Sequence, residues 1–334
     1  MKKGLKRLTI AGCIVGALAL TIGVLNIVPP KKVLDGNPNS FIIEEGSRPL
    51  IAAHRGGKNL NPENTFKAID YSVEHFDIDI IEMDLCLTKD DHLILNHNMT
   101  IDSSTEEKEV EGSYYVREHN LKELQTKNFG YNFKDKDGNY PYRNVLDGVS
   151  EEDKSNVLKE NKLRVVTIDE LFEVYASTDI RYIIEIKDDE EDGLKAADIL
   201  LKAMKNHNVM NKVIIGTFHT EVESYIEENY PEAMRGASLG SAAGFIITQM
   251  LGVNIFYDAT VTALQIPTSY TLKGITLQLA KKNYINRAHR RNISVQFWTI
   301  NDKDEMRQLI EMGADVIMTD NPDMMYELLK EMGY

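Results

Sequence analysis

Short apolar runs alternate with longer amphipathic segments along the chain from about residue 48 onward. This alternation predicts repeated strand–helix units and a mainly parallel sheet. The runs that fit strands are 50–54, 80–84, 181–187, 213–217, 234–239, 261–266, 294–299 and 315–318. A TIM barrel needs about eight such strands, so the pattern predicts an α/β fold of the TIM (β/α)8 type over residues 48–334.

Two helix starts can be read from capping residues. Asn61 can cap a helix whose first residue is Pro62, and this helix would run to about residue 76. Thr167 and Glu170 have the spacing of a capping box.

One apolar run, 93–97, follows its predecessor too closely for a parallel crossover, which needs roughly a dozen residues or more. We therefore expect a hairpin arm whose turn is 89–92. A turn centred there places His97 opposite Asp84.

Residues 99–165 are polar and interrupt the alternation. They hold one modest helical pattern at 120–127 among turn-forming and charged residues. A long irregular segment in a compact domain is usually a lid or a binding loop, or is disordered. We therefore expect an insertion over the C-terminal face of the barrel.

An apolar stretch near the amino end, 8–28, carries no charge and is long enough to cross a bilayer, which needs roughly 20 residues. The basic segment 1–7 predicts a cytoplasmic amino end and an extracytoplasmic catalytic domain. We therefore expect a single-pass membrane anchor at 1–30 and an exposed linker at 31–47. A cleaved signal peptide and a lipoprotein modified at Cys13 are the alternatives. The run is long for a signal peptide, and most of it follows Cys13.

Composition narrows the choice of partners. The chain is 43% hydrophobic and 27% charged, as in ordinary globular proteins. Its formal net charge of −14 argues against nucleic acid as a partner, because the phosphate backbone requires a basic surface. A few buried cations can still bind one small phosphorylated substrate.

Charged residues interrupt two predicted strands at their carboxyl ends, where TIM barrels hold their active sites. Glu82 and Asp84 share one strand face, and so do Glu185 and Lys187. Taken singly, such pairs are more often solvated or salt-bridged. Three carboxylates that converge would repel one another, and a divalent cation would relieve this; oxygen ligands favour Ca²⁺ or Mg²⁺.

Other groups at the predicted strand ends suit a phosphate ester. Arg55 can bind phosphate through two hydrogen bonds, and Lys187 can supply a second cation. Of His54 and His97, one imidazole can accept a proton while the other donates one, although an isolated histidine is more often a hydrogen-bonded structural group. Trp298 is either a core aromatic or an apolar wall for a substrate.

An ordered set of motifs resembles the glycerophosphodiester phosphodiesterase family. The motifs are AHRG at 53–56, NPENT at 61–65, EMDLCLTKDDHLILNHN at 82–98, EIK at 185–187, FWTIN at 297–301 and MTDNP at 318–322. The resemblance implies a TIM barrel with His54 and His97 as the acid/base pair. It also implies a divalent cation, Ca²⁺ or Mg²⁺, held by Glu82, Asp84 and Glu185.

The same resemblance implies that Arg55 and Lys187 bind the phosphate, and that Trp298 and Phe218 contact the glycerol or the leaving alcohol. One departure is Asn98, where the family usually has Asp after the second histidine. The implied reaction is hydrolysis of glycerophosphodiesters to glycerol 3-phosphate and an alcohol.

Four other functions compete with that reaction. The same site can serve a lysophospholipase D or a hydrolase of glycerol-phosphate polymers such as teichoic acid. A non-catalytic binding module would have lost a ligand or a histidine, and none of the expected ones is missing. A phosphatidylinositol-type phospholipase C shares the barrel and the histidines but is disfavoured by the E-x-D, E-x-K and NPENT motifs.

Overall fold

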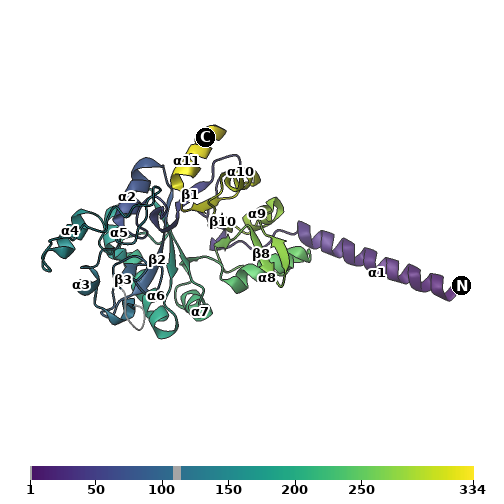
Figure 1. Ribbon diagram of the computed structural model, residues 1–334. Coiled ribbons are helices and arrows are strands. Elements are labelled where there is room, and N and C mark those ends of the chain that lie inside the picture. The colour runs from purple at the N-terminus through teal and green to yellow at the C-terminus, as the bar shows by residue number, and fades with distance from the viewer. Residues whose placement is uncertain (1, 108–113) are drawn as a thin grey trace.

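Eight parallel strands form a barrel in the computed structural model, which describes residues 2–107 and 114–334 (Figure 1). The strands are β1 (Leu50–Ala53), β2 (Ile80–Leu87), β4 (Arg181–Ile186), β5 (Val213–Gly216), β6 (Met234–Arg235), β7 (Ala263–Ile266), β10 (Ser294–Phe297) and β11 (Val316–Thr319). Their order is β6-β5-β4-β2-β1-β11-β10-β7, and a parallel bridge between Gly236 and Ala263 joins the two ends. The predicted TIM barrel is confirmed, with its first and last strands side by side.

Helices connect the strands and cover the outside of the barrel (Figure 1). They are α2 (Phe66–His75), α5 (Ile168–Tyr175), α6 (Glu190–Asn206), α7 (Thr220–Asn229), α8 (Leu239–Met250), α9 (Lys282–His289), α10 (Lys303–Met312) and α11 (Pro322–Met332). The largest apolar cluster lies between these helices and the outer faces of the strands. Burial of that surface holds the two layers together.

The helix start predicted at Asn61 is wrong, whereas the capping box is confirmed. Asn64 has a φ of 56°, which no helix tolerates, so α2 begins after it. Thr65 caps α2 by accepting a hydrogen bond from the amide of Ala68. Thr167 and the N3 residue of α5 make both hydrogen bonds of the capping box.

Alternate strand residues face the barrel interior, where Ala52, Ile80 and Ile183 belong to a second buried cluster. Residues two apart in a strand share a face. Glu82 and Asp84 therefore point into the interior like Ile80, and Glu185 of β4 does so like Ile183. The carboxylates therefore project inward where the strands end.

The linker predicted as exposed is not exposed throughout. Phe41 is fully buried and belongs to the interior cluster of the barrel. Its carbonyl accepts a hydrogen bond of 2.8 Å from the Ser294 hydroxyl at the start of β10. The linker therefore contributes a bulky ring to the core inside the barrel.

The predicted hairpin forms, but its register differs by one residue. Strand β3 (Leu93–Leu95) pairs antiparallel with β2, and Leu85 lies opposite Leu95. The turn centres on Asp90 because Asp91 adopts a φ of 64° and shortens it. Asn96, not His97, therefore lies level with Asp84. The backbone amide of Asn96 donates to the backbone carbonyl of Asp84 over 3.0 Å.

The segment between β3 and α5 contains η3 (Val116–Glu118), α3 (Leu121–Leu124) and α4 (Lys154–Glu160). Residues 108–113 of the predicted insertion lie outside the described residues. The helix predicted at 120–127 is one turn long. Val116, Leu124 and Phe129 pack on Cys86 and Ile94 of the hairpin in a small core of their own. Figure 1 places α3 and α4 beside α2 and α5.

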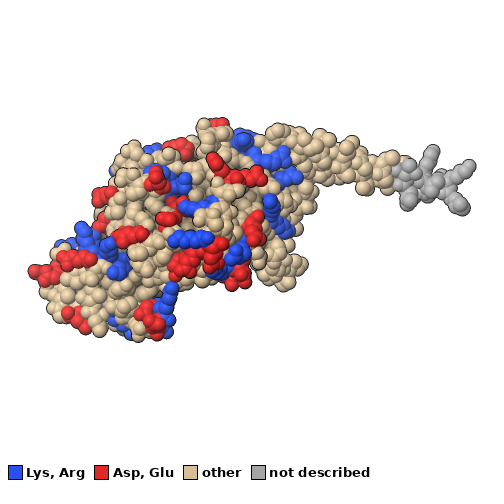
Figure 2. Space-filling view, turned by 90° about the horizontal axis from the view of Figure 1, so that it is seen from above, with Lys and Arg blue, Asp and Glu red and all other residues tan. Residues whose placement is uncertain are grey.

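Helix α1 (Lys2–Ile27) projects from the barrel as a rod (Figures 1 and 2). Its segment Ile10–Ile27 is long and apolar enough to cross a membrane, a test that a signal sequence also passes. The end of α1 is fixed to the domain because the Asn26 side chain donates to the Gly252 carbonyl over 2.8 Å. Gly252 lies between α8 and η4 (Asn254–Phe256).

A second hairpin, made of β8 (Ser269–Leu272) and β9 (Ile275–Gln278), separates β7 from α9. The sequence pattern did not predict it. Polar and apolar residues alternate along its two strands, and these strands form a sheet of their own, separate from the barrel. It adds a flap beside α8 (Figure 1).

Candidate active site

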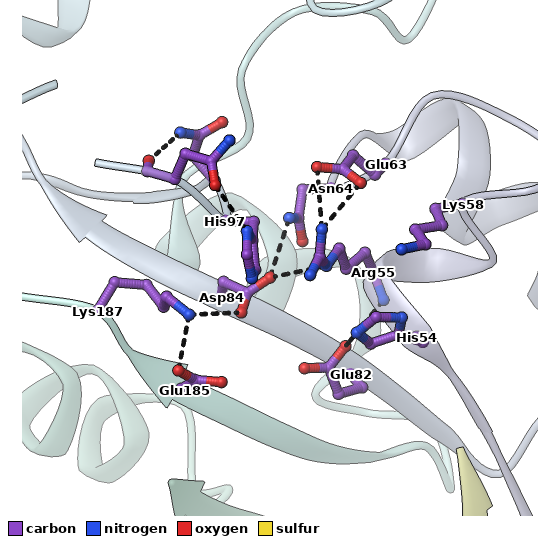
Figure 3. A network of polar contacts seen from close by, with 12 residues as sticks. His54, Arg55, Lys58, Glu63, Asn64, Glu82, Asp84, His97, Glu185 and Lys187 are labelled. Atoms are coloured by element: carbon purple, nitrogen blue, oxygen red, sulfur yellow. Dashed lines mark hydrogen bonds and ion pairs between the residues drawn. The ribbon is translucent and has the colours of Figure 1, made fainter. Parts of the chain in front are cut away.

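One cavity of about 280 Å³ opens at the carboxyl ends of the strands. All nine side chains that the sequence singled out line it: His54, Arg55, Glu82, Asp84, His97, Glu185, Lys187, Phe218 and Trp298. Residues far apart in the chain meet there because each follows or ends a strand of a closed barrel. Figure 3 shows the polar members of this set from close by.

A tight turn, η2 (His54–Gly56), carries the first histidine. Gly57 has a φ of 94°, and a Cβ atom there would lie 2.7 Å from the Ser72 hydroxyl of α2. Arg55 itself has a positive φ of 52°. The turn thus requires glycine for both its conformation and its close packing on α2, and this fixes the direction of His54 and Arg55.

His54 lies between two carboxylates from neighbouring strands. Its Nδ1 is 2.5 Å from Oδ1 of Asp320, and its Nε2 is 3.9 Å from Oε2 of Glu82. Asn301 donates to the other oxygen of Asp320 over 2.7 Å. Burial alone would lower the pKa of His54, but Glu82 and Asp320 raise it above its ordinary value.

Asp320 is a site residue to which the sequence reasoning gave no role. The pairing of Ala53 with Thr319 places it level with His54. The available signal was the closure of the barrel, because a carboxylate directly after the last strand must lie beside the first strand. His54 in turn holds the pKa of Asp320 below its ordinary value, against the effect of burial.

Glu82 is almost completely buried, with 4% of its surface exposed. Its Oε2 accepts a hydrogen bond of 2.8 Å from the backbone amide of Arg55. Burial, together with the nearby charges of Asp84 and Glu185, raises the pKa of Glu82 to about 7, although His54 opposes this. Burial is the largest of these causes, so the environment of Glu82 disfavours its charged form.

Arg55 bridges two carboxylates in Figure 3. Its Nε lies 3.4 Å from Oδ2 of Asp84, and its Nη1 lies 3.1 Å from Oε2 of Glu63. Asn64 also donates to Asp84, over 3.4 Å. Glu63 and Asn64 belong to the NPENT motif, whose contribution to the site was not predicted. The Nε of Arg55 has no hydrogen-bond partner of good geometry, so part of the guanidinium's donor capacity is unused.

Lys187 extends from the end of β4 toward the same carboxylates. Its Nζ lies 2.7 Å from Oε1 of Glu185 and 3.7 Å from Oδ1 of Asp84. Asp84 and Glu185 are direct partners in the pairing of β2 with β4, which explains why they converge. Burial would lower the pKa of Lys187, but these two carboxylates raise it, so its ammonium stays charged.

His97 lies just beyond β3, half-buried at the rim of the cavity. Its Nδ1 is 2.9 Å from Oδ1 of Asn98, and since that oxygen can only accept, Nδ1 carries a proton. Burial and the charges of Arg55 and Lys187 lower the pKa of His97, although Asp84 opposes them. The two imidazoles of the cavity are thus shifted in opposite directions.

Two aromatic side chains form an apolar wall of the cavity. Phe218 follows β5 and is 61% exposed, and Trp298 follows β10 and packs against the interior cluster of the barrel. Both line the cavity together with its polar groups. The wall offers a flat apolar surface to a carbon skeleton.

The three predicted metal ligands line one cavity, and two of them, Asp84 and Glu185, are paired with cationic side chains. Within residues 2–107 and 114–334, no three His, Cys, Asp or Glu side chains gather closely enough to form a ligand set. Arg55 and Lys187 contact Asp84 and Glu185 instead. The donors are nevertheless hard carboxylate oxygens, and the raised pKa of Glu82 marks a place where added positive charge would be favourable.

Together these features define a TIM-barrel site in which two imidazoles lie with carboxylates and cationic side chains in one cavity. The profile of the Glycerophosphoryl diester phosphodiesterase family matches residues 54–324. This chain belongs to that family.

Relatives and solved structures agree with the fold. The chain is 25% identical over 284 residues to the glycerophosphodiester phosphodiesterase of Caldanaerobacter subterraneus subsp. tengcongensis, covering 85% of this chain and 99% of the relative. A glycerophosphoryl diester phosphodiesterase domain of Mycobacterium tuberculosis superposes with a TM-score of 0.65 at 14% identity, over 85% of this chain and all of the other. An Oleispira antarctica phosphodiesterase in complex with sn-glycerol-3-phosphate gives 0.60 at 18% identity, over 85% and 97%.

Proposed function

We propose that this protein hydrolyses glycerophosphodiesters to glycerol 3-phosphate and an alcohol. One observation carries the proposal: both histidines, three carboxylates, two cations and two aromatic rings line a single cavity at the carboxyl ends of the strands. One relative carries the name glycerophosphodiester phosphodiesterase, and one solved neighbour is in complex with the product sn-glycerol-3-phosphate. The fold, the family and the site therefore support the same reaction.

In the reaction, His54 is the general base. The buried Asp320 carboxylate accepts the proton of Nδ1, which leaves the lone pair of Nε2 to take a proton from the glycerol 2-hydroxyl or from water. The oxygen that loses this proton forms a new bond to phosphorus. Attack by water gives glycerol 3-phosphate directly, whereas attack by the 2-hydroxyl gives a cyclic phosphate, which a water molecule must then open to give glycerol 3-phosphate. The same carboxylate stabilises the imidazolium that results.

His97 is the general acid. The bond between phosphorus and the leaving oxygen breaks, and Nε2 of the His97 imidazolium donates its proton to that oxygen. The lowered pKa of His97 makes it the stronger proton donor of the two imidazoles. Its exposed position at the rim suits a group that must meet a departing alcohol.

Arg55 and Lys187 neutralise the phosphodiester, and the carboxylates beside them are donors suited to a divalent cation, Ca²⁺ or Mg²⁺. Glu82, Asp84 and Glu185 would hold the cation, which would supply further electrostatic stabilisation of the phosphoryl oxygens. Because the carboxylates now pair with Arg55 and Lys187, added positive charge would release both side chains for the substrate.

We place the enzyme at the cell membrane, anchored by α1 with its catalytic domain extracytoplasmic. The apolar segment Ile10–Ile27 has no charged residue, and basic residues precede it. Treatment of membranes with alkaline carbonate tests this, since an anchored chain stays in the pellet, whereas a chain cleaved after α1 is released.

The decisive experiment replaces His97 by Ala. Loss of a general acid lowers turnover by roughly 10²–10⁴-fold. The assay follows glycerol 3-phosphate released from glycerophosphocholine, with Ca²⁺ or Mg²⁺ present or removed by a chelator. His92, on the exposed turn of the first hairpin, provides the matched control, His92→Ala. Near-normal turnover in the folded His97→Ala protein would refute the assignment.

A further inference from the structure

A second long stretch of the chain, besides the run at 8–28, carries no charge. No Asp, Glu, Lys or Arg occurs from 236 to 257, which includes α8 and η4. The helices before and after it, α7 and α9, both hold charged residues. An outer helix of a globular domain normally turns a charged face toward water, so this part of the barrel has an unusual surface.

The outward side chains of this stretch are apolar. Ile247, Met250 and Leu251 are 55%, 57% and 65% exposed, and their spacing puts them on one face at the end of α8. Phe256, in η4, is 69% exposed. We call residues 247–256 the α8–η4 corner. Such a concentration of exposed apolar side chains marks an interaction site rather than ordinary surface.

The apolar surface continues from the corner into a cavity of about 240 Å³ between α8 and the hairpin of β8 and β9. Ile247 and Met250 line this cavity, and none of its described lining residues is charged. The cavity meets the active site at Phe218 and Trp298, which line both. The corner therefore belongs to one continuous apolar surface beside the active site.

The corner is attached to the end of α1. The Asn26 side chain donates to the carbonyl of Gly252 over 2.8 Å, and a Cβ atom added at Gly252 would lie 3.4 Å from Cγ2 of Ile22. Closer to the domain, Arg290 donates to the carbonyls of Asn26 and Val28 over 2.7 and 3.0 Å. Figure 1 shows α8 at the end of the molecule from which α1 projects. These contacts fix the corner relative to α1.

The same contacts set the depth of the corner in a membrane that α1 crosses. A bilayer needs roughly 20 residues of helix, and the uncharged run 8–28 is hardly longer, so the end of the run must lie at the surface of the hydrocarbon layer. At about 1.5 Å per residue, Ile22 then lies roughly 9 Å below that surface. Gly252 is level with Ile22, and the exposed Leu251 directly precedes it, whereas the charged Arg290 is level with the surface itself. The corner therefore reaches into the hydrocarbon layer.

The backbone of the corner suits a place in lipid, where water cannot satisfy amide groups. The amides of Leu251, Val253 and Phe256 donate to carbonyls of α8 or of the corner over 2.9–3.0 Å. The carbonyl of Gly252 accepts from the end of α1. Asn254, a polar residue of the corner, is buried with 1% of its surface exposed. The groups that would be costly in hydrocarbon are thus bonded internally or turned away from it.

We infer that the α8–η4 corner inserts into the membrane leaflet nearest to the domain, so that its binding partner is a lipid bilayer. The inference rests on the proposed anchoring by α1 and is independent of which diester is cleaved. The bilayer then holds the catalytic domain at two places, α1 and the corner. The active-site cavity keeps a fixed height and direction relative to the membrane instead of rotating freely about a tether.

The test measures contact between the corner and hydrocarbon. Full-length protein is reconstituted in vesicles of phosphatidylcholine and phosphatidylglycerol, with an environment-sensitive fluorophore attached through Leu251→Cys. Cys13→Ser removes the exposed native thiol, and Cys86 is fully buried. The vesicles contain lipids with a nitroxide quencher on the acyl chain, either near the glycerol or near the free end. The label at residue 251 should lose fluorescence, and lose more of it to the nitroxide near the glycerol.

Two further labels calibrate the measurement. Leu18 is 59% exposed near the middle of the run 8–28, so a label at Leu18→Cys should be quenched most by the nitroxide near the free end. Val174 is 52% exposed on α5, which Figure 1 places far from α1, so a label at Val174→Cys should keep its fluorescence.

A charge in the corner tests whether its apolar side chains hold it in the bilayer. With the label moved to Phe256→Cys, quenching should fall in Met250→Asp and persist in Met250→Leu. Val174→Asp is the matched control and should leave the quenching unchanged. A Tm close to that of the unsubstituted chain shows that each variant is folded.

Each outcome decides the matter. An unquenched label at residue 251 beside a quenched label at residue 18 would overturn the inference and leave the anchor in place. Emission at residue 251 that is shifted to the blue without quenching would mean that a second copy of the chain covers the corner, and would overturn it too. So would quenching at residue 256 that Met250→Asp does not reduce.

Failure of the proposals on which the inference depends is seen separately. An unquenched label at residue 18 would show that α1 does not cross the membrane, and the inference would fall with the anchor. Cleavage of glycerophosphocholine is assayed on the same vesicles, so loss of the proposed reaction is distinguished from loss of membrane contact.

Discussion

The pairing of Asp320 with His54 is the contact most open to a direct test, through Asp320→Asn. The change keeps the shape of the side chain and an oxygen that can accept from Nδ1 of His54, but it removes the charge. Asp320 is 5% exposed, so water cannot replace the lost interaction. The hydrogen bond that it accepts from Nδ1 of His54 involves an ionised acceptor and is therefore stronger than a bond between neutral groups.

A hydrogen bond to a charged group contributes about 1.5–3 kcal/mol. The imidazolium of His54 forms as the reaction proceeds, so most of this contribution is lost from the transition state. With about 1.4 kcal/mol per tenfold change, kcat/KM should fall roughly 10- to 150-fold.

The pH profile of kcat/KM gives an independent readout. A general base works unprotonated and a general acid works protonated. The pKa of the base His54 is raised and that of the acid His97 is lowered, so the higher pKa, which sets the alkaline limb, belongs to His54. Asp320 helps to raise the pKa of His54, so Asp320→Asn should move the alkaline limb to lower pH. The acid limb, set by His97, should stay in place.

Asp323→Asn is the matched control, because Asp323 lies three residues on and pairs with the exposed Lys136, at 3.2 Å. It should change neither the rate nor the profile. The assignment of His54 as the base fails if Asp320→Asn leaves the alkaline limb unmoved, moves it to higher pH, or costs less than about threefold in rate.

Three further predictions follow from local geometry. Gly57→Ala should reduce the free energy of unfolding in urea by about 1–3 kcal/mol, because φ is 94° and the new Cβ would meet Ser72 at 2.7 Å. Gly148 also has a positive φ, but a Cβ atom added there would have no other atom within 4 Å. An equal loss of stability in Gly148→Ala would therefore exclude close packing as the cause at Gly57. Thr167→Ala should lower stability by about 1 kcal/mol through loss of the capping box, and Thr167→Ser should restore it; a Tm equal to wild type in the alanine variant would contradict this. Arg55→Lys should lower kcat/KM on glycerophosphocholine by about tenfold, since one ammonium cannot reproduce a guanidinium fork, and a change under twofold would remove Arg55 from phosphate binding.

The sequence predicted the site residues better than the contacts among them. Strand alternation is local, so it correctly indicated that Glu82 and Asp84 share a face and that Glu185 and Lys187 do. The predicted helix start at Asn61 and the predicted hairpin register were both wrong. In each case one residue with a positive φ decided the local conformation: Asn64 before α2, and Asp91 in the hairpin turn.

What the sequence determined by itself is the alternation that builds a barrel and the placement of reactive groups at strand ends, because both follow from periodicity along a short stretch of chain. Only the tertiary structure decided that Asp320 orients His54 and that an apolar cavity adjoins Trp298. The first depends on closure of the barrel between its first and last strands, and the second on how α8 packs beside a hairpin. Neither relation is encoded in neighbouring residues, since each arises only when distant segments meet.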